Sequence, residues 1–321
     1  MDSTDTASLP FISVVIPAHD GTKTLPFTLF NLVGQRYPRD RFELVIVDDR
    51  SKDETKNLVR EFMESYAALG LNIRLAENTG SGAAEARNTG ILLSKGEIVA
   101  LTDQDVFIPP AWLMEVANAM QGDAAGAYGE IVTDMTRFFE PLLSTSIRKK
   151  YLTANVAYRR EALLEVGMFS KDFPFYRGDS EIAYKVLEKG RAIRYAPDMV
   201  VFHPLRRFRR GDLTGAFKWS VYDPLLLKRH AKYASEDTFS MVIPGLTPEG
   251  SAFLVFVASV LLVAFLVSPE VAVGLGLGLI VFVTLGLAAI RPAARHPGTG
   301  EQRRCDAQDA AEREREGRPE R

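Results

Sequence analysis

Two carboxylates stand two residues apart directly after an apolar run. Asp103 and Asp105 follow Ile98 to Leu101, a short apolar run of the kind that forms a buried strand. Carboxylate oxygens are the ligands that hard divalent cations prefer, and two of them fill only part of an octahedral shell. The pair therefore suits Mg²⁺ or Mn²⁺ that also holds a substrate diphosphate. Asp-x-Asp is also common in turns, because aspartate bonds to its own nearby backbone.

The elements around this pair alternate along the chain. Runs of β-branched and other apolar residues predict strands at 12–16, 44–47, 73–75 and 98–101. Apolar residues at helical spacing predict helices at 25–33, 58–66 and 83–94. A capping box of Ser51 and Glu54 is expected to begin the second helix. This alternation predicts an α/β fold with a parallel sheet, whose ligands lie at the carboxyl ends of the strands.

Six ordered blocks stand out in the first 205 residues, at 12–20, 44–55, 82–90, 102–105, 151–160 and 166–169. Together they resemble the family 2 glycosyltransferases. His19-Asp20 stands where that family usually has Tyr-Asn, and Arg50 stands where it usually has glycine. The resemblance implies a GT-A, Rossmann-like nucleotide-diphospho-sugar transferase domain over residues 11–205. It also implies an inverting transfer of a sugar from a nucleotide diphosphate donor to an acceptor hydroxyl.

The same resemblance implies which residues hold the donor. They are Pro17, Ala18, Asp20, Asp49, Arg87 and Asp103. Asp49 would meet the nucleobase, where a carboxylate accepts the single ring N–H of uracil or thymine. This favours a UDP- or dTDP-sugar and leaves a guanosine carrier open. Arg87 would hold phosphate oxygens near a helix N-terminus. The structural alternatives are that Asp49 only ends a strand and that Arg87 forms a surface ion pair.

The segment 177–185 resembles the family's segment that carries the catalytic base. Asp179 falls on the base and Glu181 on the second acid, while Gly178 replaces a usual glutamate. An inverting transfer needs one carboxylate to take the proton from the attacking hydroxyl. The alternative is that the two acids only stabilise the first turn of a helix through their charge.

Further residues are candidates for binding the metal and the acceptor. His203 follows a strand at 199–202 and stands where the family often has a histidine near the metal, so Asp105 and His203 are the predicted metal ligands. A structural histidine is the alternative. Asn155, in the fifth block, is predicted on the acceptor side. Arg206 and Arg207 are predicted to contact a lipid diphosphate, or else to be only a basic flank of a membrane segment.

The remainder of the chain predicts a membrane attachment. Residues 251–268 and 271–290 carry no charge and are separated by a tight turn, which predicts a C-terminal two-helix transmembrane hairpin over 251–290. Buried helices of a soluble core are the alternative. Basic residues interleaved with aromatic ones at 206–250 predict an interfacial segment. A flexible N-terminus is expected at 1–10 and a disordered charged tail at 291–321.

Charge and targeting signals complete the prediction. Basic flanks on both sides of the hairpin place the catalytic domain in the cytoplasm, at the inner or plasma membrane. No signal peptide is predicted in the first residues. The net charge of −2 argues against a nucleic-acid partner, and a single cysteine, Cys305, excludes an internal disulfide framework.

The sequence therefore predicts a membrane-anchored glycosyltransferase with Mg²⁺ or Mn²⁺ as cofactor. A lipid-linked or polysaccharide acceptor is expected, in the assembly of a polysaccharide or the cell envelope. A catalytically silent membrane scaffold of the same fold is one alternative, and Gly178 and His19-Asp20 are the departures that favour it. A nucleotidyltransferase is the other, although the basic Gly-rich phosphate loop that it needs is missing after the first strand.

Overall fold

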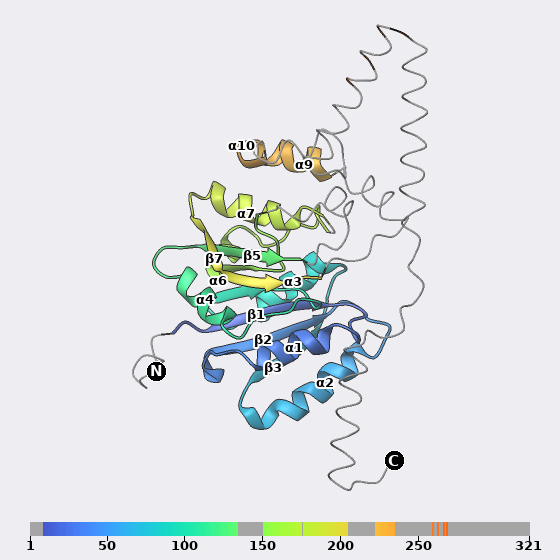
Figure 1. The fold of residues 1–321 in the computed structure, drawn as a ribbon, viewed down its shortest axis with the longest axis vertical. Helices are drawn as coiled ribbons and strands as arrows, with labels where there is room; N and C mark the ends of the chain where they lie inside the picture. The colour runs from blue at the N-terminus through green and yellow to red at the C-terminus, as the bar shows by residue number, and fades with distance from the viewer. Residues whose placement is uncertain are drawn as a thin grey trace. The chain divides into compact units, whose positions relative to one another are not determined.

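The computed structural model describes residues 9–133, 150–174, 176–204 and 222–234, together with residues 259, 262, 266 and 268 (Figure 1). The chain divides into two units, Met1–Phe253 and Leu254–Arg321, and nearly all of the described residues belong to the first. The predicted membrane hairpin and charged tail fall outside the described ranges, apart from those four residues. Within the described ranges, no helix is both long and apolar enough to cross a membrane.

A seven-stranded sheet forms the centre of the first unit (Figure 1). Its strands are β1 (Ile12–Ala18), β2 (Phe42–Asp48), β3 (Asn72–Glu77), β4 (Ile98–Leu101), β5 (Gly126–Val132), β6 (Val156–Arg159) and β7 (Ile193–Phe202). Their order across the sheet is β3-β2-β1-β4-β6-β5-β7. β1 to β4 run parallel, as the alternation predicts, whereas β6 runs antiparallel to both of its neighbours. The sheet is therefore mixed.

Helices cover both faces of this sheet. The longer ones are α1 (Leu25–Val33), α2 (Thr55–Tyr66), α3 (Ala83–Leu93), α4 (Trp112–Ala119) and α7 (Gly178–Glu188). Shorter ones are the 3₁₀ turns η2 (Arg39–Arg41) and η3 (Ala67–Leu69), then α6 (Arg160–Glu165) and α10 (Ala231–Ala234), while α9 (Tyr222–Arg229) is as long as α4. The predicted capping box is wrong. α2 begins at Thr55 with Glu54 as its N-cap residue, which makes no side-chain cap bond, and the Ser51 hydroxyl accepts the Asp20 N–H (3.0 Å).

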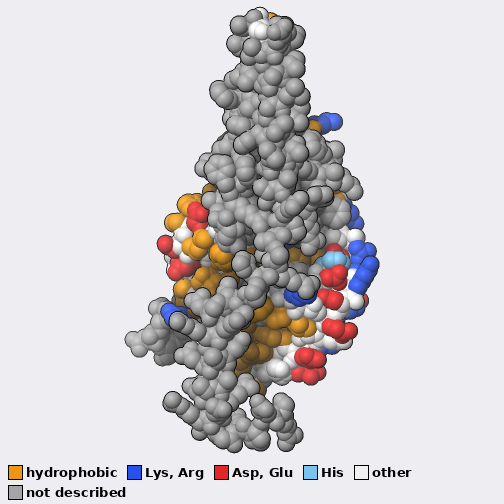
Figure 2. Space-filling view, turned by 45° about the vertical axis from the view of Figure 1, so that its right-hand side comes forward, with side chains coloured by type: hydrophobic (Ala, Val, Ile, Leu, Met, Phe, Trp, Pro, Cys, Tyr) orange, Lys and Arg blue, Asp and Glu red, His pale blue; other side chains and the backbone are white. Residues whose placement is uncertain are grey.

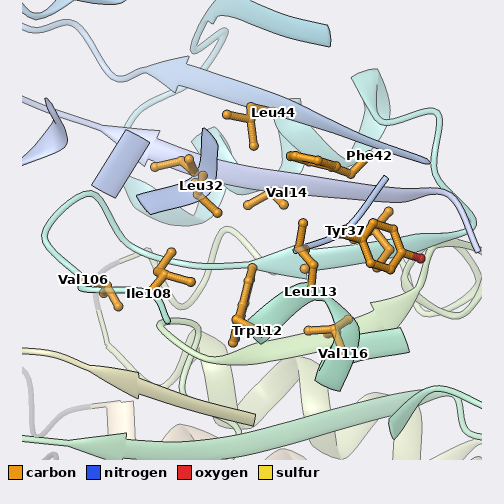
Figure 3. Close-up of a cluster of buried hydrophobic side chains, with 14 of the residues drawn as sticks. Val14, Leu32, Tyr37, Phe42, Leu44, Val106, Ile108, Trp112, Leu113 and Val116 are labelled. Atoms are coloured by element: carbon orange, nitrogen blue, oxygen red, sulfur yellow. The ribbon is translucent and has the colours of Figure 1, made fainter. Parts of the chain in front are cut away.

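Alternate residues of the central strands pack into two separate hydrophobic cores. Val14 lies in a cluster with side chains of α1 and α4, part of which is drawn in Figure 3. Its neighbour Val15 lies in the other cluster, with side chains of α3, α6 and α7. Successive strand residues point to opposite faces. This explains why the central strands are continuous apolar runs, and it leaves only their carboxyl ends for polar residues.

The pair α9–α10 packs against α7 within the first unit. Leu226 and Ala234 are fully buried in a cluster with Phe173 and Tyr184. The Tyr233 hydroxyl donates to the Leu187 carbonyl (3.2 Å). Part of the apolar surface that the sequence assigns to a membrane interface is therefore used inside the protein. This packing concerns residues 222–234, since the remainder of 206–250 is not described.

Polar contacts around α9–α10 fix the same arrangement. His230 Nδ1 lies 2.9 Å from Glu188 Oε1, and Arg229 pairs with Asp172 while its guanidinium lies 5.5 Å from the centre of the Phe173 ring. Glu188 ends α7, and α7 carries the predicted base in its first turn. The segment that follows residue 221 is thus tied to the helix that bears Asp179.

We expect Leu226→Ala to loosen this contact. Truncating a buried leucine costs about 2–5 kcal/mol. Because α9–α10 is a small cluster beside the main cores, the loss should appear as local opening. Backbone amides of residues 222–234 should exchange with solvent at least about 10-fold faster, as measured by mass spectrometry. Leu225→Ala, at a partly buried neighbour, should have a smaller effect. Equal exchange rates in Leu226→Ala and the unmodified protein would contradict this packing.

Candidate active site

Three loops meet at the carboxyl ends of β1, β2 and β4, and hydrogen bonds join them. The Gln104 amide pairs with the backbone of His19, accepting from its N–H (2.9 Å) and donating to its carbonyl (3.0 Å). Asp20 Oδ1 accepts the Lys52 N–H (2.7 Å). Sequence reasoning assigned no role to Gln104, although its place between Asp103 and Asp105 marks it. These bonds hold the predicted donor residues of three strands in one frame.

Many charged side chains lie together on one part of the described surface. In Figure 2, acidic, basic and histidine side chains gather on the right-hand side, beside a group of hydrophobic ones.

Among the predicted donor residues, Ala18 is buried within β1, and Asp20 has φ +46° in the loop that follows. Pro17 also belongs to β1, paired in register with Val47 of β2. Pro17 and Ala18 thus place the loop rather than offering polar side chains.

Asp49 lies where the loops after β2 and β3 meet. Its Oδ1 accepts from the Asn78 amide (2.7 Å), and its Oδ2 accepts the Gly82 N–H (2.9 Å). Gly82 has φ +88° and precedes α3, so glycine suits this close approach of backbone to carboxylate. The side chain keeps 14% of its surface exposed. Asp49 is therefore firmly oriented and still reaches the surface, and Asn78 is a supporting residue that the sequence reasoning missed.

Arg87 and Asp103 form an ion pair. Arg87 Nη2 lies 2.7 Å from Asp103 Oδ1, and the guanidinium lies 5.9 Å from the centre of the Phe169 ring. The Arg87 side chain is mostly buried, and its Nε has no hydrogen-bond partner among the described residues. Arg87 thus forms an ion pair, as the structural alternative expects, but the pair is with Asp103, another of the predicted donor residues.

Asp103, Asp105 and His203 converge at the ends of β4 and β7. His203 Nε2 lies 3.5 Å from Asp105 Oδ1 and 4.0 Å from Asp103 Oδ2. The bridge between Phe107 and Phe202 brings the end of β7 to this point. Within the described ranges, no group of three or more acidic, histidine or cysteine side chains is arranged so that it could hold a metal ion. The three groups match an incomplete shell of oxygen and nitrogen ligands, to which a diphosphate could add.

Asp179 and Glu181 lie in the first turn of α7 but have different surroundings. Asp179 is partly exposed, and its Oδ1 accepts the N–H of Ser180 (2.8 Å). Glu181 is 3% exposed and pairs with Lys185 Nζ (3.4 Å). Burial raises the pKa of Glu181, and the Lys185 charge opposes that rise. Asp179 is therefore accessible from the surface, whereas Glu181 is a buried ion-pair residue of the helix.

Tyr158 is a further buried group that the sequence reasoning did not single out. It lies on β6 with no exposed surface, and its hydroxyl has no hydrogen-bond partner among the described residues. Burial raises the pKa of Tyr158, and the negative charge of Asp179 raises it further. Tyr158 and Asp179 therefore interact electrostatically, and Tyr158 remains protonated at neutral pH.

Asn155, which is predicted on the acceptor side, has its side chain enclosed between strands in this structure. Its amide is buried, donates to the carbonyls of Glu130 and Met199 (2.7 Å each) and accepts from Trp112 Nε1 (2.8 Å). The register of β5 and β7 shifts at Glu130, which leaves carbonyls there without ladder partners. Asn155 satisfies these carbonyls, and buried polar groups need such partners. Arg206 and Arg207 lie outside the described residues.

Asp53 ties the loop after β1 to the start of α2. Its Oδ1 accepts from the Thr55 N–H (3.0 Å), and its Oδ2 accepts from the Thr22 hydroxyl (2.8 Å) and N–H (3.3 Å). Burial raises the pKa of Asp53, but the hydrogen bonds from Thr55 and Thr22 outweigh it and lower the pKa to about 2. The ionised carboxylate is therefore part of the frame that holds the site.

Asp53→Asn should lower stability in a pH-dependent way. The folded pKa lies below the unfolded value of about 3.9, so the carboxylate contributes its full stabilisation above about pH 4 and loses it as the pH falls toward 2. We expect a loss of about 1 kcal/mol at pH 7 in urea unfolding, which shrinks between pH 4 and pH 3. A loss that stays constant from pH 7 to pH 3 would show that ionisation of Asp53 is irrelevant.

Comparisons with known proteins show similarity to glycosyltransferases. The family model for "Glycosyl transferase family 2" matches residues 13–181. Glycosyltransferase AglE of Haloferax volcanii is 30% identical over 216 residues, which cover 63% of this chain and 70% of that protein. Beta-monoglucosyldiacylglycerol synthase of Trichormus variabilis is 32% identical over 120 residues, which cover 37% of this chain and 25% of that protein.

A solved structure shares the fold. The mannosyltransferase PcManGT of Pyrobaculum calidifontis, in complex with GDP-Man and Mn²⁺, superposes with a TM-score of 0.53 at 22% identity. The superposition covers 96% of this chain and 81% of that protein. The predictions of an α/β, GT-A fold and of a glycosyltransferase are thus confirmed, and the chain belongs to glycosyl transferase family 2.

Proposed function

We propose that this glycosyltransferase carries out a metal-assisted, inverting transfer of a sugar from a nucleotide diphosphate donor to a hydroxyl of a lipid-linked or polysaccharide acceptor. The observation that carries the proposal is the convergence of Asp103, Asp105 and His203 beside the Asp49 loop. A base-binding carboxylate and a metal-binding group at one edge of the sheet match the two ends of a nucleotide diphosphate.

The donor set fits a hard divalent cation. Asp105 and His203 would hold Mg²⁺ or Mn²⁺, with Asp103 beside them, since carboxylate oxygen and neutral imidazole are both accepted ligands of Mn²⁺. When bound, the ion neutralises charge on the departing diphosphate. Arg87 adds positive charge at the same point through its pair with Asp103 and could donate to a phosphate oxygen.

Asp179 would act as the general base. The acceptor oxygen forms a bond to the anomeric carbon, the bond from that carbon to the diphosphate oxygen breaks, and Asp179 takes the hydroxyl proton. Attack in line with the leaving group inverts the configuration. The partial exposure of Asp179 at the start of α7 supports this role, whereas the buried ion pair of Glu181 supports a positioning role for that residue.

A membrane-bound acceptor is the remaining part of the proposal. The uncharged runs at 251–268 and 271–290, with Arg206 and Arg207 before them, support a catalytic domain held on the cytoplasmic side of the inner or plasma membrane. One relative is named as a synthase of a glucosylated diacylglycerol, which supports a lipid acceptor. Arg206 and Arg207 would meet the headgroup or the diphosphate of that acceptor.

Nucleotide release tests the proposal before the acceptor is known. The full chain in detergent is incubated with UDP-, dTDP-, GDP-, CDP- and ADP-sugars in Mn²⁺, Mg²⁺ or EDTA, and slow hydrolysis of the donor is measured. We expect release from one class of donor, dependent on the metal. Binding of nucleotide without turnover would point to a missing acceptor, whereas no binding by any nucleotide would favour the silent scaffold.

A further inference from the structure

Arg50 occupies a backbone position that normally suits glycine. It follows Asp49 at the end of β2 and has φ +60°, in the left-handed region where a side chain brings a steric cost. Its Nη2 donates to the Ser81 hydroxyl in the turn before α3, and its Nε lies 3.6 Å from Asp49 Oδ1. The side chain is 63% exposed. Arg50 thus extends across the Asp49 carboxylate, from one loop to the next, at the surface.

The contacts of Asp49 limit what it can still bind. A carboxylate offers about four acceptor positions. Asn78 and Gly82 use two of them, and Arg50 lies beside a third, while no other partner of this carboxylate occurs among the described residues. Asp49 therefore has room for one more N–H donor, and the Arg50 guanidinium stands beside that position with further N–H donors of its own.

The position of Arg50 in the sheet assigns it to the base end of a nucleotide. β1 lies between β2, which leads to Arg50, and β4, which leads to Asp103 and Asp105. Neighbouring strands are about 4.8 Å apart, so β2 and β4 are separated by about 10 Å across the sheet. Arg87 pairs with Asp103, and His203 lies beside Asp103 and Asp105. Arg50 is thus placed to contact the base and not the diphosphate.

We propose that Asp49 and Arg50 together read a lactam edge, in which a ring N–H is next to a ring carbonyl. Asp49 accepts the N–H, and Arg50 donates to the neighbouring carbonyl oxygen. Uracil, thymine and guanine carry this edge. Adenine and cytosine carry instead a ring nitrogen without hydrogen beside an amino group. The ring nitrogen, an acceptor, would face the Asp49 carboxylate, and the amino group, a donor, would face the Arg50 guanidinium, so neither hydrogen bond could form. Arg50 is then a specificity-determining residue, and this inference rests on the proposed donor site.

Binding of nucleoside diphosphates tests this assignment. Dissociation constants for UDP, dTDP, GDP, CDP and ADP, and for inorganic pyrophosphate, are measured by calorimetry on the full chain in detergent with Mn²⁺. The variants are Arg50→Gly and Arg50→Lys. Arg50→Gly removes the left-handed strain and should retain or raise the melting temperature. Arg60→Ala removes another exposed arginine, on α2, where it bonds Asn57 (2.8 Å), and serves as the control.

The expected result concerns only the lactam bases. Arg50→Gly should weaken the preferred one of UDP, dTDP and GDP on the order of 10-fold, while CDP, ADP and pyrophosphate stay within about two-fold. The affinity of Arg50→Lys should lie between those of the unmodified protein and Arg50→Gly, because an ammonium keeps the positive charge but lacks the paired N–H donors of a guanidinium. Unchanged affinities in Arg50→Gly, or an equal loss for pyrophosphate, would overturn the role of Arg50. If the unmodified protein binds no nucleotide, the proposed donor site fails as well.

Discussion

Asp179→Asn is expected to reduce turnover by about 10³-fold while donor binding stays within a few-fold of the unmodified protein. A general base contributes about 10²–10⁴-fold, because the acceptor hydroxyl must lose its proton as it attacks. Asparagine keeps the shape of the side chain and its contact with the Ser180 N–H, but it cannot take a proton. The check is to measure the turnover number and the donor dissociation constant separately, at saturating Mn²⁺.

Glu181→Gln is the matched control for this prediction. It lies two residues further along α7 and is buried against Lys185, so its loss should lower stability more than it lowers turnover. If Asp179→Asn retained most of its activity while Glu181→Gln lost it, the two acids would have to exchange roles. An equal loss of donor binding in Asp179→Asn would instead place Asp179 on the donor side.

Asp105→Ala is expected to weaken Mn²⁺ binding in the presence of nucleoside diphosphate on the order of 100-fold. His203→Ala should weaken it less, because the imidazole is neutral and the carboxylate supplies the charge. Free Mn²⁺ is measured by electron paramagnetic resonance during titration, so the result does not depend on turnover. Nucleotide release should fall in parallel.

Asp123→Ala is the control for the metal prediction. Asp123 is an exposed carboxylate that pairs with Arg194 (2.7 Å), away from the ends of β4 and β7. Its removal changes the net charge as Asp105→Ala does, and it should leave Mn²⁺ binding unchanged. If Asp105→Ala bound Mn²⁺ as tightly as Asp123→Ala, Asp105 would not be a metal ligand.

The parallel half of the fold follows from local patterns. Strands β1 and β2 are buried on both faces, so they appear as unbroken apolar runs and are recognisable without any partner. The carboxyl ends of such strands then place Asp49, Asp103 and Asp105 at one edge, whatever the details of the loops. Burial on both faces and the position of strand ends are local properties, which is why this part could be predicted.

The contacts of Asn155, Ser51 and Leu226 depend on residues that are distant in the sequence. Asn155 lies in a block that resembles the family's acceptor side, but the register shift between β5 and β7 determines what its amide meets. Ser51 could cap α2 by its spacing, yet the Asp20 N–H uses its hydroxyl. Leu226 suits a membrane interface by composition, and α7 covers it. In each case a distant partner competes for the side chain, and sequence spacing does not reveal that partner.

The configuration of the transferred sugar distinguishes an inverting transfer with Asp179 as the base from other mechanisms. The donor identified by nucleotide release is supplied to the full chain with a lipid extract, and the product is examined by nuclear magnetic resonance of its anomeric proton. We expect that an α-linked donor yields a β-linked product, formed only with a divalent metal and lost in Asp179→Asn. A product with retained configuration, or transfer that persists in Asp179→Asn, would contradict it.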